Sequence, residues 1–344
     1  MTRLRICQVV AGPCVGGLEK HIFGLVRELR DRHDITVLAP EAWRAGVPEG
    51  AAFRLVNLDR WRLDPRAVMD LRRALRETDA QVVHAHASKA AGMSRIAARP
   101  LHCAQVATVH GLKSSAGPYR GGGRRVIAVS EAAARRLRLP DTIVIPNGVA
   151  LPHVPEHAGA PLLASVGAPA DKSVVCAVGR MAQVKGFDVL LRAWRGVDAT
   201  LLLLGTGPEL QKLQAEAAAL GIGERVLFLG WRDDAPAVQA SCDLCVLSSR
   251  REGFPLTLVE ALQVGTPVVS TRVPGAEDML PDEFLAPIED ADELATRINA
   301  ALADLPRVRE VFAPIFERAR RELTLAAMAQ RVEAVYFDAL RDLD

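Results

Sequence analysis

The first 150 residues alternate between short apolar runs and segments whose apolar positions repeat every three or four residues. Short apolar runs predict buried strands, and the longer repeat predicts amphipathic helices. We expect strands over residues 4–10, 34–38, 51–58, 81–86, 105–110, 125–130 and 142–145. We expect helices over residues 18–30, 65–76 and 131–139, with Ser130 as the N-cap of the last one.

A proline-rich stretch over residues 151–169 interrupts this alternation and is typical of a domain seam. The alternation resumes beyond it. We expect strands over residues 173–179, 199–205, 226–229, 244–248 and 267–270, and helices over residues 187–194, 209–220, 235–240 and 252–264. A long amphipathic helix is expected over residues 323–343.

Repeated strand–helix units with continuous apolar strands predict an α/β fold, in which helices cover both faces of parallel sheets. A chain of 344 residues is long for one core. We therefore expect two Rossmann-like domains facing a central cleft, with the first domain at residues 1–160 and the second at 161–322. The helix over about 323–344 is expected to pack back on the first domain.

Composition adds no sign of a membrane span or of a disulfide framework. No uninterrupted apolar segment approaches about 18 residues, and the short N-terminal apolar run predicts a strand, not a signal peptide. Cys242 and Cys245 form a CxxC pair, but the chain has no second pair at zinc-finger spacing. We expect buried reduced thiols and a cytoplasmic protein, with a redox or metal role as the alternative.

Charge is divided unevenly along the chain. Residues 1–150 carry 24 Lys and Arg against 13 Asp and Glu, whereas the remainder carries 19 against 28. A basic first half is typical of a protein with an anionic partner, such as a membrane surface. A solvated basic face, or complementarity between the two halves, explains the asymmetry equally well.

The segment over residues 251–262 holds two carboxylates, Glu252 and Glu260, eight positions apart. Gly253 and the start of a predicted helix lie between them. Helix starts bind phosphate through unsatisfied N–H groups, and carboxylates accept hydrogen bonds from hydroxyls. The segment therefore predicts a pocket for a molecule with hydroxyls at both ends and a diphosphate in the middle, as in a nucleotide sugar. A glycosidase acid/base pair is the alternative interpretation of two carboxylates.

Two further loops lie between a predicted strand and a predicted helix. Gly16 and Gly17 allow close approach of a ligand to the backbone, although a tight turn needs them as well. Arg180 and Lys185 are two cations that can clamp a diphosphate. Surface solvation is the alternative for these cations, but ligands of parallel sheets bind at this end of the strands. Gly205 opens a partial and weak match to a dinucleotide-binding loop.

Histidines follow or end two of the predicted strands. His110 ends one strand and is followed by a glycine, and His84 and His86 end another. A lone histidine is more often structural than catalytic. His153 and His157 have only a superficial metal-ligand spacing, because their proline-rich context is not helical.

In their order and spacing these motifs resemble the retaining nucleotide-sugar glycosyltransferases of family 4, which have the GT-B fold. The resemblance covers nearly the whole chain. The motifs that carry it are Gly16-Gly17 with Glu19, residues 83–86, 108–111, 129–130 and 145–149, Gly179-Arg180 with Lys185-Gly186, residues 205–209, Gly230 and residues 252–260. The first loop departs from the pattern at Pro13-Cys14-Val15, which leaves the acceptor open.

The resemblance implies a role for each matching residue. Arg180 and Lys185 would neutralise the diphosphate leaving group, Glu252 would contact the transferred sugar, and His110 would lie near the reacting face of that sugar. Glu260 would accept hydrogen bonds from the ribose hydroxyls. The expected donor-binding residues are Gly16, Gly17, Gly205, Gly253, Phe254, Pro255, Leu256 and Glu260. Family members generally need no metal, and no Asp-x-Asp motif indicates one, so we expect neither a metal nor a cofactor.

We therefore expect an enzyme that moves a hexose or N-acetylhexosamine, with retention, from a nucleotide sugar, expected to be UDP-linked, to a glycan or glycolipid. Lipopolysaccharide or surface-polysaccharide synthesis is the expected setting, on the inner face of the cytoplasmic membrane and without a nucleic-acid partner. A sugar-nucleotide epimerase of similar fold and a noncatalytic nucleotide-sugar binder are the alternatives.

Overall fold

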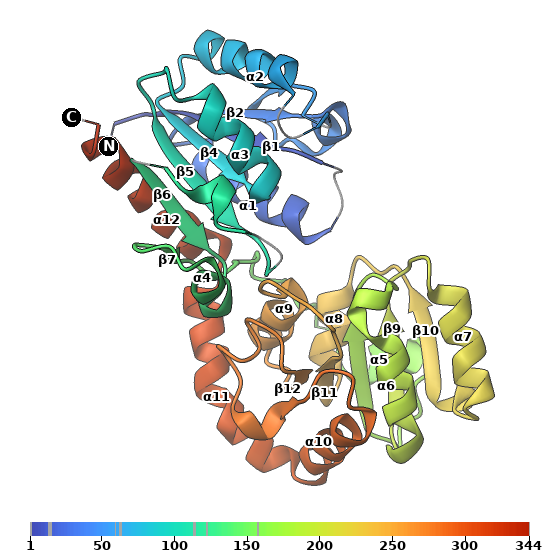
Figure 1. Cartoon of the computed structure of the whole chain (residues 1–344). Helices are drawn as coiled ribbons and strands as arrows, with labels where there is room; N and C mark the ends of the chain where they lie inside the picture. Colours follow the sequence, from blue (N-terminus) through green and yellow to red (C-terminus); the bar gives the residue numbers. More distant parts are fainter. Residues whose placement is uncertain are drawn as a thin grey trace. The chain divides into compact units, whose positions relative to one another are not determined.

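The computed structural model describes residues 2–12, 16–58, 60–61, 64–112, 115–121, 123–156 and 158–343 (Figure 1). The chain divides into two compact units. The first comprises Met1–Ala150 with Thr324–Asp344, and the second comprises Leu151–Leu323. The boundary predicted at residue 160 therefore lies ten residues beyond the structural one.

The first unit is built on a seven-stranded parallel sheet with the order β3-β2-β1-β4-β5-β6-β7. Its strands are β1 (Arg5–Val10), β2 (Asp34–Ala39), β3 (Ala52–Leu55), β4 (Val82–His86), β5 (Ala104–Val109), β6 (Arg124–Ala128) and β7 (Ile143–Val144). Its α-helices are α1 (Gly17–Leu29), α2 (Pro65–Glu77), α3 (Ala87–Ala97), α4 (Glu131–Leu137) and α12 (Leu325–Arg341).

Alternate side chains of β1 enter two separate cores. Ile6 packs with residues of α1 and α12, whereas Cys7 packs with residues of α2 and α3. A strand that is apolar on both faces needs helices on both sides, which explains the continuous apolar runs in the sequence. The Ser130 side chain accepts a hydrogen bond from the Ala133 N–H at 3.2 Å, so the predicted N-cap of α4 is confirmed.

The C-terminal helix α12 is joined closely to the first unit. A Cβ on Gly148 would lie 2.2 Å from the Thr324 carbonyl oxygen, so only glycine permits this approach. The Leu325 N–H donates to the Val149 carbonyl at 3.1 Å. Tyr336 of α12 is fully buried. The helix at the end of the chain is thus part of the first core, next to elements from the beginning of the chain.

The second unit is built on a six-stranded parallel sheet with the order β10-β9-β8-β11-β12-β13. Its strands are β8 (Val174–Val178), β9 (Thr200–Leu204), β10 (Val226–Gly230), β11 (Leu244–Leu247), β12 (Val268–Thr271) and β13 (Leu285–Ala286). Its α-helices are α5 (Ala160–Ser165), α6 (Phe187–Ala193), α7 (Leu210–Ala219), α8 (Ala235–Ser241), α9 (Leu256–Val264), α10 (Ala291–Ala303) and α11 (Leu305–Glu322). Helix α6 contacts α7 and α10, whereas α9 contacts α8 and α11.

The two parallel sheets confirm the predicted fold class, but several helices were not predicted. Helix α3 is rich in Ala, Gly and Ser, which gives it little apolar periodicity. Helix α5 lies within the proline-rich stretch, where Pro161 occupies the start of the helix and is tolerated there. Pro314 lies inside α11 and reads as a helix breaker in the sequence.

Five cysteines lie in the described ranges, and all are free and buried. Burial raises the pKa of Cys7 and of Cys103 to about 11, so both thiols stay protonated at neutral pH. The expectation of buried reduced thiols is confirmed for these five, while Cys14 lies outside the described residues. Within the part of the chain that the structure describes, no helix has the length and apolar character needed to cross a membrane.

Candidate active site

The second unit reverses its strand order at β8. This strand lies between β9 and β11, so the chain builds one half of the sheet outward from β8 and then returns to build the other. Ligands of open parallel sheets bind outside the carboxyl ends of the strands at such a reversal. Arg180 and Lys185 follow β8, and Glu252 follows β11. The topology therefore brings three of the predicted site residues to one edge of one sheet.

Lys185 and Glu252 form an ion pair at this edge. The Lys185 Nζ lies 2.6 Å from the Glu252 Oε1, and the two side chains are 23% and 13% exposed. The Ser249 hydroxyl donates to the same oxygen at 2.7 Å. We expected the lysine and the glutamate to bind different parts of the donor. The structure shows that each also fixes the position of the other.

The loop that carries Lys185 is held against the strand end of β11. The Ser248 hydroxyl donates to the Lys185 carbonyl at 3.0 Å. Gly186 has a φ of 64°, and a Cβ there would lie 2.1 Å from the Ser248 carbonyl oxygen. Only glycine fits this close contact, so the loop after β8 and the loop after β11 form a single packed unit.

Arg180, in the same loop after β8 as Lys185, is a free cation. It is exposed, and its guanidinium forms no ion pair or hydrogen bond with the residues that the structure describes. A guanidinium in this state can donate two parallel hydrogen bonds to a phosphate without first breaking an internal contact. Arg180 is therefore available to an anionic ligand, whereas Lys185 is already paired with Glu252.

Arg250 was not predicted, yet it holds the two loops together. Its guanidinium donates to both carboxylate oxygens of Asp188, at 2.7 and 2.6 Å, and to the Gln183 carbonyl at 2.6 Å. It also pairs with Glu289. Burial acts to raise the pKa of Asp188, but the hydrogen bonds and charge of Arg250 outweigh it and lower that pKa to about 2. The signal for Arg250 in the sequence was weak, because its partners lie far away along the chain.

Helix α9 begins at Leu256 with Pro255 as its N-cap, and no side chain caps its first turn. Uncapped N–H groups at a helix start are a binding site for an anion. Phe254 is buried, and Gly275 lies so close that a Cβ would be 2.8 Å from the Phe254 ring. Gly253, before them, is half-buried. The segment that leads into the helix is therefore held rigidly.

Glu260 lies about one turn into α9 and is half-buried. The helix was predicted to begin at Glu252, which would have placed Glu260 two turns inside it. That start is wrong, because residues 252–255 form a non-helical entry segment, with a bend at Gly253 and Phe254, that ends in a proline. Glu252 consequently lies on the loop, where its side chain reaches Lys185, and Glu260 lies on the helix.

Gly205 has a structural reason to be glycine. A Cβ there would lie 2.0 Å from the Gly179 carbonyl oxygen, and the Gly205 N–H donates to the Gly230 carbonyl at 2.7 Å. Three strand ends therefore meet backbone to backbone. The donor-binding role that the resemblance implies for Gly205 remains a prediction beside this packing role.

In the first unit the strand order reverses at β1, between β2 and β4. Gly16, with a φ of 83°, precedes α1, and Gly17 is the first residue of that helix. Both glycines are exposed, and among the described residues no atom lies within 4 Å of a Cβ built on Gly16 and no side chain caps the helix. The start of α1 is thus an open backbone surface. Pro13, Cys14 and Val15, where the chain departs from the family pattern, lie outside the described residues.

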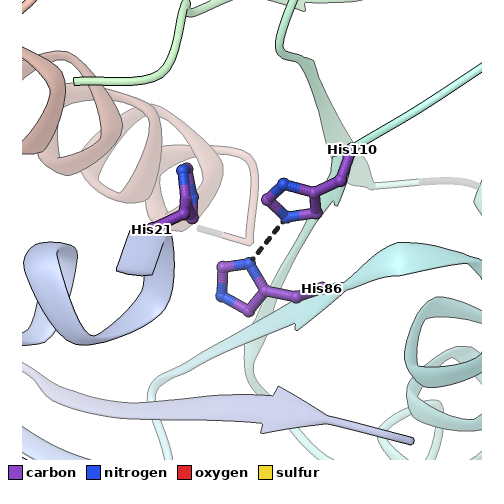
Figure 2. Close-up of side chains that lie close together, drawn as sticks. All are labelled: His21, His86 and His110. Carbon is purple, nitrogen blue, oxygen red and sulfur yellow. Dashed lines mark hydrogen bonds between the residues drawn. The ribbon is translucent and has the colours of Figure 1, made fainter. Parts of the chain in front are cut away.

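The side chains of three histidines, one of them on α1, lie close together (Figure 2). His86 ends β4, His110 follows β5, and His21 lies in the second turn of α1. The His86 Nδ1 lies 3.2 Å from the His110 Nε2, and the ring centroids of His21 and His110 are 4.6 Å apart. His21 was not predicted as a site residue. Its position on the apolar face of the helix, four residues before Leu25, was the available signal.

A chain of hydrogen bonds fixes the protons on these rings. The Gln8 Nε2 donates to the Tyr336 hydroxyl at 3.1 Å, so the Gln8 Oε1 faces the His86 Nε2 at 2.7 Å. A carbonyl oxygen only accepts, so His86 carries its proton on Nε2 and its Nδ1 is a lone pair. The His110 Nε2 then donates to that lone pair, which leaves the His110 Nδ1 as an acceptor.

Burial keeps these imidazoles neutral. It is the main cause that lowers the pKa of His21 to about 4 and that of His84 to about 3. Burial, with the neighbouring histidines as a smaller cause, holds the pKa of His86 and of His110 well below the usual range. Ala87, directly after His86, has a φ of 65°, which is rare outside glycine. Such strain gathers at functional sites, and the rest of the fold must hold it in place.

Glycosyltransferase family models match both units of the chain. Residues 15–151 match the model of Glycosyltransferase Family 4, and residues 172–304 match that of the Glycosyl transferases group 1. A phosphatidyl-myo-inositol mannosyltransferase of Mycobacterium leprae is 31% identical over 93% of this chain and 92% of its own length. The lipopolysaccharide core biosynthesis glycosyltransferase LpsD of Rhizobium meliloti is 29% identical over 86% of this chain and 87% of its own.

A solved structure shows the same fold. Anabaena HepE, crystallised with UDP, superposes with a TM-score of 0.84 at 23% identity, covering 97% of this chain and 99% of its own. The two parallel sheets, the family models over both halves and a relative at 31% identity over nearly the whole chain lead to one conclusion. The chain belongs to glycosyltransferase family 4 and is a glycosyltransferase of the GT-B fold.

Proposed function

We propose that this glycosyltransferase moves a hexose or N-acetylhexosamine from a UDP-linked sugar to a glycan or glycolipid, with retention at the sugar carbon. The observation that carries the proposal is the edge of the second sheet. There lie a free arginine, a lysine–glutamate pair that joins two packed loops, and an uncapped helix start. This set of groups matches a diphosphate joined to a sugar.

The names of similar proteins support this choice of substrates. HepE was crystallised with UDP, and a related structure contains UDP and glucose. Other relatives are named for lipopolysaccharide core synthesis or for mannosyl transfer to phosphatidyl-myo-inositol. We infer from them a UDP-sugar donor and a lipid-linked or glycan acceptor for this chain.

We propose that the transition state is stabilised mainly at the leaving group. As the sugar–phosphate bond breaks, negative charge develops on the diphosphate. Arg180 and the N–H groups at the start of α9 are preorganised donors for that charge, and Lys185 adds a second cation. Glu252 would orient the sugar hydroxyls, and Glu260 those of the ribose. Because these protein groups supply the stabilisation, we propose that transfer needs no metal ion and no cofactor.

His110 is proposed to act at the sugar. Its Nδ1 is the accepting nitrogen of a ring whose other nitrogen is bonded to His86. A neutral imidazole held in one tautomer can accept a hydrogen bond from a sugar hydroxyl and keep that sugar in one orientation. Gly16 and Gly17 would offer backbone N–H groups to the diphosphate from the first domain.

We also propose that the first domain associates with an anionic membrane surface. Trp61 is 73% exposed and Met69 is 65% exposed. Met69 lies on helix α2, which also carries the exposed arginines Arg66 and Arg76. Apolar side chains among cations favour binding at a lipid headgroup layer.

Sedimentation with vesicles of phosphatidylglycerol at low salt should carry the protein down, and vesicles of phosphatidylcholine should not. Equal sedimentation with both would overturn this part.

The donor is tested by incubating the protein with UDP-, GDP-, ADP- and dTDP-linked sugars and following its unfolding temperature. A ligand that binds only the folded state raises this temperature by mass action. We expect a clear rise with UDP-sugars and little with the others. A larger rise with another nucleotide would replace UDP in the proposal. Proton NMR of the transferred sugar would then show whether the anomeric configuration is retained.

A further inference from the structure

The histidine cluster has the composition and geometry of a metal site. One nitrogen of each ring of His21, His86 and His110 lies within 4.8 Å of the others. We propose that these three residues bind a single zinc ion, and that the bound ion inhibits sugar transfer by occupying His110. The inhibitory role rests on the proposed function, in which His110 contacts the sugar and the reaction itself uses no metal.

The distance between two of the rings fits a zinc site. Two ligands of a tetrahedral zinc ion with bonds of about 2.0–2.1 Å lie about 3.3 Å apart. The His86 Nδ1 and the His110 Nε2 are 3.2 Å apart. A metal ion can therefore replace the hydrogen bond between them with little movement. The proton that His110 carries on Nε2 moves to its Nδ1, so the imidazole stays neutral and no proton is lost.

His21 has a buried ring nitrogen without a hydrogen-bond partner among the described residues, which a purely hydrogen-bonded cluster would not explain. Its Nδ1 lies 2.9 Å from the Asn147 Oδ1 and donates to it, so its Nε2 is a lone pair. That Nε2 is buried and has no hydrogen-bond partner among the described residues. Buried polar atoms in folded proteins nearly always have a partner. A metal ion held by His86 and His110 would provide one.

The surrounding residues already form the outer shell that metal-binding histidines have. Such a histidine donates its second N–H to a carbonyl or carboxylate, which fixes the ring. His21 donates to Asn147, and His86 donates to Gln8. Both partners accept through amide oxygens on elements that do not belong to the histidine's own strand or helix. Two of the three rings are therefore preset with the lone pair that a metal needs.

The ligand set selects the kind of metal. Three neutral imidazoles with no carboxylate suit zinc and other transition metals, whereas magnesium and calcium need oxygen ligands. Three protein ligands leave the fourth position of a tetrahedral ion open, and His110 is only partly buried. Three histidines and one open position are typical of accessible zinc sites. Because the same His110 is proposed to contact the sugar, an ion there excludes that contact.

The test is a titration of the purified protein with zinc in competition with a chromophoric chelator, compared with the His21→Ala variant. We expect one equivalent bound by the wild type and at least 100-fold weaker binding by the variant. The exposed residues His102 and His153 provide controls, and His102→Ala and His153→Ala should bind as the wild type does. Asn147→Ala, which removes only the outer-shell partner, should weaken binding about 10-fold or more.

Two further measurements make the result decisive. Bound cobalt should give the visible spectrum of a tetrahedral site in the wild type and not in His21→Ala, and circular dichroism should show that the variants are folded. Zinc should inhibit transfer by the wild type, chelation should reverse the inhibition, and His21→Ala should be at least 10-fold less sensitive. Equal zinc affinity of the wild type and His21→Ala would overturn the site. Stoichiometric binding without inhibition would overturn the inhibitory role.

Discussion

At the scale of single residues, the Lys185–Glu252 pair shows how stability and catalysis share the same groups. Both side chains are largely removed from water, and each satisfies the charge of the other. Removing one member of such a pair leaves an uncompensated charge, which costs more than the intact pair contributes. A variant of either residue must therefore be examined for folding as well as for activity.

Lys185→Ala should lower kcat/KM by about 10²–10³-fold, because it removes a cation from the leaving-group site and frees Glu252 to move. Steady-state kinetics with the preferred donor measures this. Lys172→Ala is the matched control, since Lys172 forms an ion pair with Asp198 at 2.9 Å but is exposed and precedes β8, at the opposite end of that strand from the site loops. Unchanged turnover in Lys185→Ala would remove this residue from the site.

The buried histidines predict a loss of stability in mild acid. Unfolded histidine has a pKa of about 6.5, whereas burial lowers the pKa of His21 to about 4 and of His84 to about 3. As the pH falls below 6.5, the unfolded chain binds protons that the folded chain does not, so the free energy of unfolding decreases. Each such group contributes a slope of up to about 1.4 kcal/mol per pH unit.

Urea unfolding at pH 7.5, 6.0 and 5.0 measures this slope. His84→Gln should reduce the slope by about the share of one histidine, whereas the exposed-site variant His102→Gln should leave it unchanged. If the free energy of unfolding is the same at pH 7.5 and pH 5.0, the histidines are not buried as neutral groups.

At the scale of elements, the site depends on loops that are pinned by close backbone contacts. Gly186 combines a left-handed φ of 64° with a contact that leaves no room for a Cβ. Arg250 fastens the same loop to α6 through Asp188. These two features fix the backbone segment that carries Lys185.

Gly186→Ala should lower both the unfolding temperature and kcat/KM, because the added Cβ forces Ser248 and Lys185 apart. Gly167→Ala is the control. Gly167 also has a positive φ, of 83°, but nothing lies within 4 Å of its Cβ position. It should therefore lose only about 1–2 kcal/mol of stability and keep its activity. Equal effects of the two variants would mean that backbone conformation, and not the close contact, determines the outcome.

The sequence could predict every strand except the two-residue β13, and the loops after those strands, because buried parallel strands have a distinctive apolar pattern. For the same reason Arg180, Lys185, Glu252 and His110 could be assigned to strand ends before their neighbours were known. The helices α3 and α11 were not predicted. Helix α3 lacks apolar periodicity, and helix α11 contains Pro314. His21 and Arg250 were not predicted as site residues, because their roles depend on partners that are distant in the sequence.

At the scale of the whole molecule, the C-terminal helix packs in the same core as the N-terminal strand β1. Helix α12 completes the first core, and its Tyr336 accepts a hydrogen bond from Gln8 of β1 and bonds to His84 of β4 at 2.6 Å. The C-terminal helix thus supports the hydrogen-bond chain that orients His86 and, through it, His110. Tyr336 is a positioning residue, since it reaches His110 only through other groups.

Tyr336→Phe should cost about 1–3 kcal/mol of stability, because buried polar groups of Gln8 and His84 lose their partner. It should also lower kcat more than it changes KM for the donor. Tyr119→Phe is the control, because Tyr119 is equally buried but its hydroxyl bonds to Ser88 at 3.2 Å. A loss of stability in both variants with no change of kcat in either would show that the hydrogen-bond chain does not act on His110.

The central claim is that the reversal point of the second sheet binds the diphosphate of a UDP-sugar. Calorimetric titration of UDP into the wild type, Arg180→Ala and Arg195→Ala tests it most directly, since Arg195 is an exposed arginine outside these loops. We expect Arg180→Ala to weaken UDP binding by about 10–100-fold, the equivalent of about 1.5–3 kcal/mol for a charged hydrogen bond, and Arg195→Ala to bind as the wild type does. Equal UDP affinity in Arg180→Ala and in the wild type would contradict the account.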